Sequence, residues 1–187
     1  MYQINTYYGN TIDFQNPSVD QIDIRDIAHN LSFENRFMGQ TKKPYSVAQH
    51  CVLGSAILEE MGDPELALMF LLHDASEAYL KDIPTPLKRL LGIAYISIET
   101  LFQMTIFQRF NLNHFDIDHP EIKRIDLAIL KTEKEQLLDE GNIEWKQLEG
   151  VNSVNIYISP WPQETAEREF LAQFNKLIKE VNNGWRE

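Results

Sequence analysis

The feature that most constrains the fold is a pair of helix-start signals joined by a short polar link. Ser46-Val47-Ala48-Gln49 has the form of a capping box, with serine at the N-cap and glutamine three residues later. Asp63-Pro64-Glu65 is a second start, with an aspartate N-cap and proline at the first helical position. We therefore expect helices over residues 46–61 and 63–80, separated at Gly62. A link this short predicts an antiparallel helical hairpin.

Apolar residues recur at helical spacing through most of the remaining chain. This spacing predicts helices over residues 19–35, 93–110, 120–138 and 162–181, and a short helical turn over 87–91. Residues 1–19 lack it, and Gly9-Asn10 between two β-prone runs predicts a small hairpin or extended arm. Residues 154–159 are one further β-like stretch. With no repeat or linker in between, we expect a single all-α domain over residues 1–187 with a short N-terminal hairpin arm.

Charge and composition exclude several classes of protein. The chain has 17 basic and 28 acidic residues, a net charge of −11, which argues against binding long nucleic acids. The single cysteine, Cys51, excludes an intramolecular disulfide and fits a reducing compartment. No apolar run approaches the roughly 20 residues that span a bilayer, and the N-terminus does not resemble a secretion signal. We therefore expect a cytoplasmic protein that does not associate with membranes.

The residues that could carry chemistry begin with His73 and Asp74, which follow the apolar run 66–72 in the expected second helix. A carboxylate buried there requires a partner, because an unpaired buried charge costs several kcal/mol. Glu77 lies four residues after His73 and three after Asp74, so it shares their helical face.

Two other segments supply matching residues. His50 lies on the first helix of the hairpin and can face His73 if the helices pack antiparallel. Asp126 is flanked by apolar residues in the helix that begins at Pro120. Two imidazoles and two carboxylates form a mixed nitrogen and oxygen site that suits a divalent ion such as Mn, Co, Zn or Fe(II). By contrast, the run Glu133-Lys134-Glu135 is interpreted as a solvated face.

The order His50, His73-Asp74, Asp126 resembles the H…HD…D pattern of the HD-domain metal-dependent phosphohydrolases. Arg36-Phe37, Glu77 and the segment Asp82-Ile83-Pro84-Thr85-Pro86-Leu87-Lys88 resemble the bacterial 5′-deoxynucleotidases. They are more similar still to small phage enzymes that hydrolyse dATP to deoxyadenosine and triphosphate. The likeness covers most of the chain and implies an HD-domain helical bundle.

The resemblance also implies roles for individual residues. His50, His73, Asp74 and Asp126 would bind the divalent metal ion, for which Mg is a further possibility. Arg36 would orient the reacting phosphate, Lys88 would bind phosphate oxygens, and Glu77 would be the general acid/base. Asp82 and the turn to Thr85 would contact the sugar. Phe37, where the deoxynucleotidases have tryptophan, would stack on the sugar or base.

The expected activity is therefore hydrolysis of deoxynucleotide 5′-phosphates, with two forms left open. One converts a dNTP, dATP by preference, to deoxynucleoside and triphosphate, and the other releases phosphate from a dNMP. A third interpretation, a non-catalytic nucleotide-binding module, predicts loss of a metal ligand or of Arg36, and all are present. The resemblance further implies a homo-oligomer, for which the apolar segment 93–110 offers a surface, in the host cytoplasm if the chain is phage-encoded.

Overall fold

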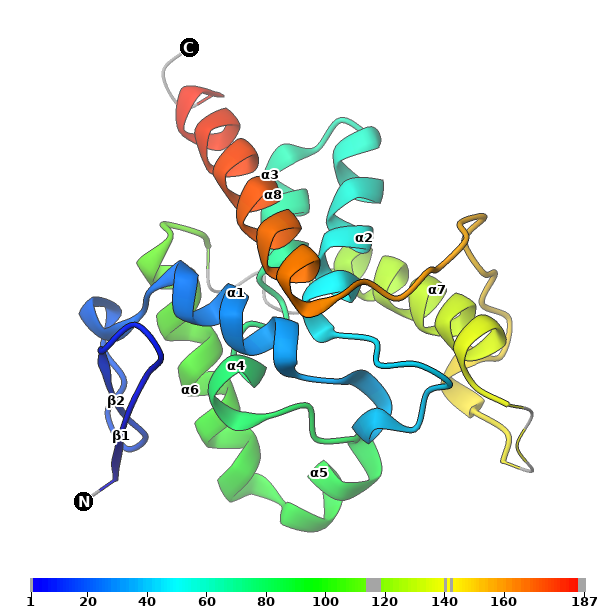
Figure 1. Ribbon diagram of the computed structural model, residues 1–187, viewed down its shortest axis with the longest axis horizontal. Coiled ribbons are helices and arrows are strands. Elements are labelled where there is room, and N and C mark those ends of the chain that lie inside the picture. The colour runs from blue at the N-terminus through cyan, green and yellow to red at the C-terminus, as the bar shows by residue number, and fades with distance from the viewer. Residues whose placement is uncertain (1, 114–118, 140, 142, 185–187) are drawn as a thin grey trace.

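The chain folds as a bundle of α-helices with a small two-stranded sheet beside it (Figure 1). The computed structural model describes residues 2–113, 119–139, 141 and 143–184. The helices are α1 (Ile24–Phe33), α2 (Val47–Glu60), α3 (Pro64–Leu71), α4 (Glu77–Leu80), α5 (Thr85–Leu91), α6 (Ile93–Arg109), α7 (Pro120–Leu137) and α8 (Gln163–Gly184). Short 3-10 turns occur at Val19–Gln21, Arg36–Gly39 and Lys146–Leu148. The prediction of an all-α fold with an N-terminal hairpin arm is confirmed.

The N-terminal arm is a β-hairpin tied to α1. Strands β1 (Gln3–Asn5) and β2 (Thr11–Asp13) pair antiparallel with Ile4 opposite Ile12. Gly9 has φ +85°, which is the left-handed conformation that the turn requires and that glycine adopts without steric cost. The buried carboxylate of Asp26 on α1 accepts hydrogen bonds from the Thr6 hydroxyl, the Tyr8 amide and the Asn10 side chain. These contacts anchor the hairpin to the bundle.

Two sequence predictions about regular structure need correction. The first helix begins at Ile24, not at residue 19, because Asp23 caps it by accepting from the Arg25 amide. Residues 154–159 form no strand, because side chains of α7 take up their backbone groups instead. Thr132 accepts from the Val154 amide at 2.9 Å, and Gln136 accepts from the Ile158 amide at 2.9 Å.

The hairpin of α2 and α3 forms as predicted, but the capping box at its start is only half made. The Ser46 hydroxyl accepts from the Gln49 amide at 3.2 Å. The Gln49 side chain does not return to Ser46: it donates to the Ser159 carbonyl at 2.9 Å and accepts from the Trp161 amide at 2.8 Å. Gln49 therefore holds the segment before α8 against the start of α2.

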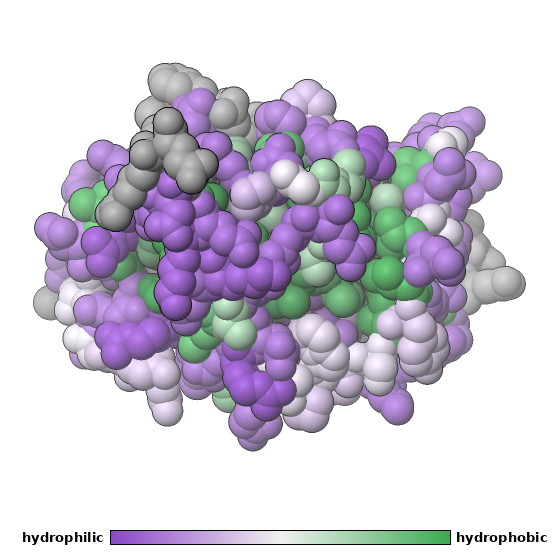
Figure 2. Space-filling view, turned by 90° about the horizontal axis from the view of Figure 1, so that it is seen from above, coloured by the Kyte–Doolittle hydropathy of each residue, from purple (hydrophilic) through white to green (hydrophobic). Residues whose placement is uncertain are grey.

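The helices α1, α2, α3 and α8 pack around one hydrophobic core, which α6 and α7 extend. Gly54 marks a close approach of helices within it, because a methyl group at this position would overlap the ring of Phe70 on α3 and lie 2.8 Å from Cδ1 of Ile129 on α7. This close contact brings α2, α3 and α7 together one helical turn beyond His50. Hydrophilic residues cover most of the face that Figure 2 shows, with hydrophobic residues visible between them.

Within the described residues, no single helix has both the length and the apolar composition needed to cross a membrane. Helices α5 and α6 pass that test only as a pair, and the chain bends by 114° between them.

Candidate metal centre

The candidate site is built on a break in the helix that the sequence predicts over residues 63–80. Helix α3 ends at Leu71, residues 72–76 form turns, and α4 begins at Glu77. Gln103, buried on α6, stabilises the break: its amide donates to the Leu72 carbonyl at 2.6 Å and accepts from the Ser76 amide at 3.2 Å. His73 and Asp74 thus lie in a turn, and the prediction that they lie mid-helix is wrong.

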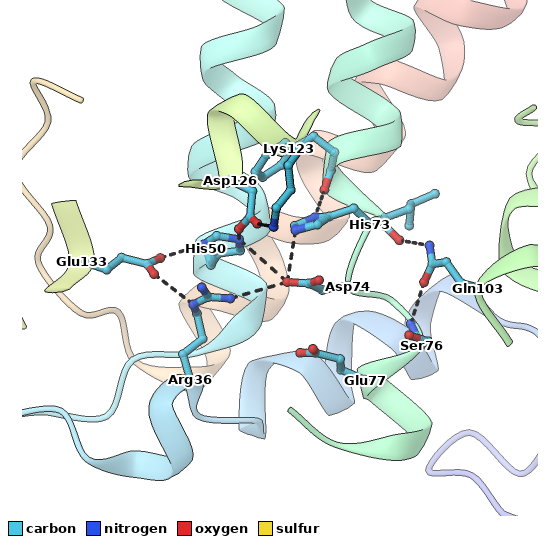
Figure 3. Close-up of polar contacts among 12 residues, drawn as sticks. Arg36, His50, His73, Asp74, Ser76, Glu77, Gln103, Lys123, Asp126 and Glu133 are labelled. Carbon is cyan, nitrogen blue, oxygen red and sulfur yellow. Dashed lines mark hydrogen bonds and ion pairs between the residues drawn. The ribbon is translucent and has the colours of Figure 1, made fainter. Parts of the chain in front are cut away.

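Four of the predicted residues converge at this turn (Figure 3). His50 comes from α2 and Asp126 from α7, and they join His73 and Asp74. The Nε2 atom of His50 lies 3.5 Å from Oδ1 of Asp126 and 3.8 Å from Oδ2 of Asp74. The Nε2 atom of His73 lies 3.2 Å from the same Asp74 oxygen. The predicted ligand set is therefore brought together in space.

Both imidazoles turn their Nε2 atom toward the cluster. Nδ1 of His73 donates to the Phe70 carbonyl at 2.7 Å, since a carbonyl oxygen can only accept. Nδ1 of His50 lies 2.7 Å from a Glu133 carboxylate oxygen. The two Nε2 atoms are buried and make no hydrogen bond within the described part of the chain. Ligand atoms of His50, His73 and Asp74 all lie within 4.8 Å of one another, so these residues could hold a metal ion.

The charges around the cluster fit a cation. Burial favours the neutral form of Asp74, but His73, His50 and Arg36 more than offset it and hold the pKa of Asp74 well below its usual range. Burial is likewise outweighed at Asp126, where the His50 imidazole at 3.5 Å and the charge of His73 lower the pKa. For His50, burial and Arg36 oppose protonation, yet Glu133 and Asp126 raise its pKa to about 9. A bound divalent ion would take the place of the imidazole protons and supply the positive charge among the carboxylates.

Arg36 lies at the edge of the cluster in a strained turn. Phe37 and Met38, which follow it, have φ of 57° and 53°, a left-handed conformation that costs non-glycine residues free energy. Arg36 is 8% exposed; its Nε donates to Glu133 at 3.0 Å and its Nη1 to Asp74 at 3.5 Å. A guanidinium therefore lies beside the candidate metal ligands.

Glu77 is buried at the start of α4, and its Oε2 has no hydrogen-bond partner among the described residues. Burial, and then the negative charges of Asp74 and Asp82, raise the pKa of Glu77 well above its ordinary value. This environment therefore favours the protonated form of the Glu77 carboxyl group.

Lys88 on α5 faces Glu77 but is already paired. Its Nζ lies 2.5 Å from Glu99 on α6 and 3.8 Å from Glu77. Burial opposes its charge, but these carboxylates raise the pKa of Lys88, so the ammonium is retained. The sequence does not predict that a carboxylate of α6 would pair with Lys88.

The remaining predicted contacts are less closely joined to the cluster. Asp82 is partly buried and donates its amide to Glu34 at 3.3 Å, and burial raises the pKa of its carboxyl group. Thr85 is exposed at the first residue of α5. The ring of Phe37 packs beside Tyr45 and lies 6.1 Å from the ring of Trp145.

Sequence reasoning missed Glu133, and its interpretation as part of a solvated face is wrong. Glu133 is 0% exposed and bridges Arg36 and His50. A signal was present: Glu133 follows Asp126 by seven residues, two helical turns, and so lies on the same face of α7. Lys123, which pairs with Asp126 at 3.0 Å, was also missed.

Fold and site together define a helical protein with a candidate His/Asp metal centre. Over 176 residues the chain is 37% identical to the uncharacterized protein YfdR of Escherichia coli (strain K12), covering 93% of this chain and 94% of that protein. It is 30% identical over 189 residues to an uncharacterized protein of Rhodobacter capsulatus, again covering 93% and 94%. The chain belongs to the family that includes these two proteins. No established protein-family model matches it.

Proposed function

We propose that this protein is a divalent-metal-dependent phosphohydrolase of the HD type that acts on deoxynucleotide 5′-phosphates. The observation that carries the proposal is the convergence of two buried, unpartnered imidazole nitrogens with the carboxylates of Asp74 and Asp126. A metal site with these ligands is also found in non-catalytic proteins. The neighbouring Arg36 and the buried Glu77, whose pKa is raised, favour phosphoryl chemistry.

Four residues would hold the ion: His50, His73, Asp74 and Asp126. A divalent ion there would supply Lewis acidity toward a phosphoryl oxygen and a lowered pKa for a water molecule. The chain's own contribution begins with Arg36. Its Nε and Nη1 are engaged by Glu133 and Asp74, which leaves Nη2 to bind a phosphoryl oxygen as negative charge develops there.

Glu77 would manage the proton of the reaction. In hydrolysis, the oxygen of water bonds to phosphorus and the water releases a proton. The bond from phosphorus to the 5′ oxygen breaks, and the departing alkoxide takes up a proton. Burial and the nearby Asp74 raise the pKa of Glu77, so it is suited to donate that proton, and the proton released by water restores its acid form. The products are a nucleoside alcohol and a phosphate or polyphosphate.

Two substrate forms remain within this proposal. Hydrolysis of dATP to deoxyadenosine and triphosphate would require cations for a long, highly charged phosphate chain. Lys88 is the residue expected to meet that chain, but Glu99 at 2.5 Å already balances its charge. This pairing favours the second form, release of phosphate from a deoxynucleoside monophosphate.

A product assay tests the proposal directly. Protein stripped with a chelator and reloaded separately with Mn, Co, Zn, Fe(II) or Mg would be incubated with dAMP, dATP, AMP and ATP. We expect hydrolysis of the deoxynucleotides, with phosphate from dAMP supporting the monophosphate form and triphosphate from dATP supporting the other. Tight nucleotide binding without turnover under every metal would instead support the non-catalytic module.

A pair of histidine variants provides the control. His73→Ala should lose both bound metal, measured by elemental analysis, and activity. His29→Ala removes a histidine that stacks on Tyr7 and pairs with Glu167, away from the cluster, and should keep both. Full metal occupancy and turnover in His73→Ala would refute the ligand assignment.

A further inference from the structure

The carboxylate of Glu133 connects His50, a candidate metal ligand, with Arg36. Glu133 is 0% exposed, and three donors surround it. Its Oε1 accepts from the Tyr45 hydroxyl at 2.8 Å and lies 2.7 Å from Nδ1 of His50, while its Oε2 accepts from Nε of Arg36 at 3.0 Å. Figure 3 shows the links to His50 and Arg36 leaving opposite oxygens of the same group. A carboxylate buried this completely is costly unless its oxygens are paired.

The contact with His50 determines which nitrogen of the neutral ring is unprotonated. A carboxylate that accepts from Nδ1–H leaves Nε2 as the unprotonated nitrogen of the neutral ring. That Nε2 is the atom 3.5 Å from Asp126 and 3.8 Å from Asp74. Partners of this kind orient ligating histidines and raise their basicity.

The contact with Arg36 restricts the guanidinium from the other side. With Nε held by Glu133 and Nη1 near Asp74, the plane of the guanidinium is fixed by two carboxylates. A planar group held at two points is pre-organised, so it loses less conformational entropy when it binds an anion.

We propose that Glu133 is a positioning residue that sets, through its two oxygens, both the metal-binding nitrogen of His50 and the phosphate-facing orientation of Arg36. The inference about Arg36 rests on the proposed function, whereas the inference about His50 requires only that the site binds a metal ion. Changing Glu133 should therefore impair metal binding and anion binding together, although Glu133 touches neither the metal ion nor the anion.

Glu133→Gln tests this with little change in shape. An amide has one accepting oxygen and one donating nitrogen, so it must present N–H either to Arg36 or to Tyr45 and His50. The contact that remains is weakened because the negative charge is lost. We expect the dissociation constant for Mn²⁺, measured by calorimetry, to rise about 10- to 100-fold. At saturating Mn²⁺, we expect the KM for dAMP to rise because Arg36 is less well held. Glu135→Gln, the same change at an exposed position on α7, should alter neither quantity.

A Glu133→Gln protein that binds Mn²⁺ and dAMP as the wild type does would overturn the proposal. If the wild type binds metal but hydrolyses no nucleotide, the proposed function fails while the measurement of metal affinity still decides the role at His50.

A second measurement on the wild type does not depend on any variant folding. In the Zn²⁺-loaded protein, nitrogen NMR of the His50 ring should show Nδ1 carrying the proton and Nε2 bound to the metal. The opposite tautomer would also overturn the proposal.

Discussion

At the scale of single residues, the charge of Lys88 depends on its neighbour Glu99. The two are 2.5 Å apart and about one-fifth to one-quarter exposed, so their pairing is only partly screened by solvent. Lys88 also faces Glu77, the proposed proton donor. Glu99 therefore controls how much positive charge Lys88 can offer a phosphate chain.

We expect Glu99→Gln to shift the protein toward substrates with more phosphates. Removing the Glu99 charge frees the Lys88 ammonium, so kcat/KM for dATP should rise relative to that for dAMP, by roughly two- to five-fold for a partly exposed pair. Steady-state kinetics with both nucleotides measures this ratio. Glu60→Gln, at an exposed position on α2, is the matched control. An unchanged ratio would mean that Lys88 does not meet the phosphate chain.

At the scale of elements, the position of α2 against α3 and α7 decides whether the ligands can converge. Gly54 allows that approach, one turn beyond His50. A side chain there would push α2 away from Phe70 and Ile129, and so move His50 away from its partners on the other helices.

We expect Gly54→Ala to destabilise the protein by about 1–3 kcal/mol, because the added methyl group overpacks a rigid buried ring. The intrinsic preference of alanine for helices, about 1 kcal/mol, offsets part of this cost. Urea unfolding followed by circular dichroism measures the change. Gly141→Ala, where the methyl group meets no atom within 4 Å, should be nearly neutral. A Gly54→Ala protein as stable as the wild type would show that the helices can separate without cost.

The start of α1 gives a pH-dependent prediction. Hydrogen bonds from the Arg25 side chain, reinforced by the Arg25 amide, lower the pKa of Asp23 below its usual value despite partial burial. A lowered pKa in the folded state stabilises the protein above the unfolded pKa of about 3.9, and this contribution is lost as the pH falls through the folded value.

We therefore expect Asp23→Asn, which keeps an N-cap acceptor but removes the charge, to lower the free energy of unfolding at pH 7 by up to about 1 kcal/mol. The difference from the wild type should shrink below about pH 4. Denaturant unfolding at pH 3 and pH 7 measures both. A difference that is equal at the two pH values would contradict the electrostatic explanation.

At the scale of the whole molecule, α5 and α6 present an apolar face on an acidic protein. The exposed large residues there are Leu90, Leu91, Ile93, Ile96, Ile98, Leu101 and Met104. Between residues 90 and 104, all of which the structure describes, the exposed side chains are uncharged. Two copies that each carry a net charge of −11 could meet at this face without bringing exposed carboxylates together.

We expect the wild type to sediment as a dimer at micromolar concentration and Ile93→Glu to sediment as a monomer. The substitution places carboxylates in an apolar interface, where they would be desolvated without partners. Ile143→Glu is a matched control, because Ile93 and Ile143 are each 77% exposed and only Ile93 belongs to the face. A monomeric wild type, or equal dissociation in both variants, would contradict a dimer through α5 and α6.

The sequence by itself determined the starts of α2 and α3 and the identity of the candidate metal ligands. Ser46 and Asp63 cap their helices through hydrogen bonds to amides only three residues away, so local chemistry is sufficient to predict them. The order of the histidines and aspartates was likewise sufficient to predict the ligands, because such residues have few roles when their sequence neighbours are apolar.

Only the tertiary structure decided how these residues are held. The chain leaves the helix after Leu71 because Gln103, about 30 residues away in sequence, offers the turn hydrogen bonds that a continued helix would not need. Glu133 is buried rather than solvated because Arg36 and His50, more than 80 residues earlier in the chain, donate to it. Local sequence patterns cannot predict the stabilisation that such distant partners provide, because the partners become neighbours only when the helical bundle has formed.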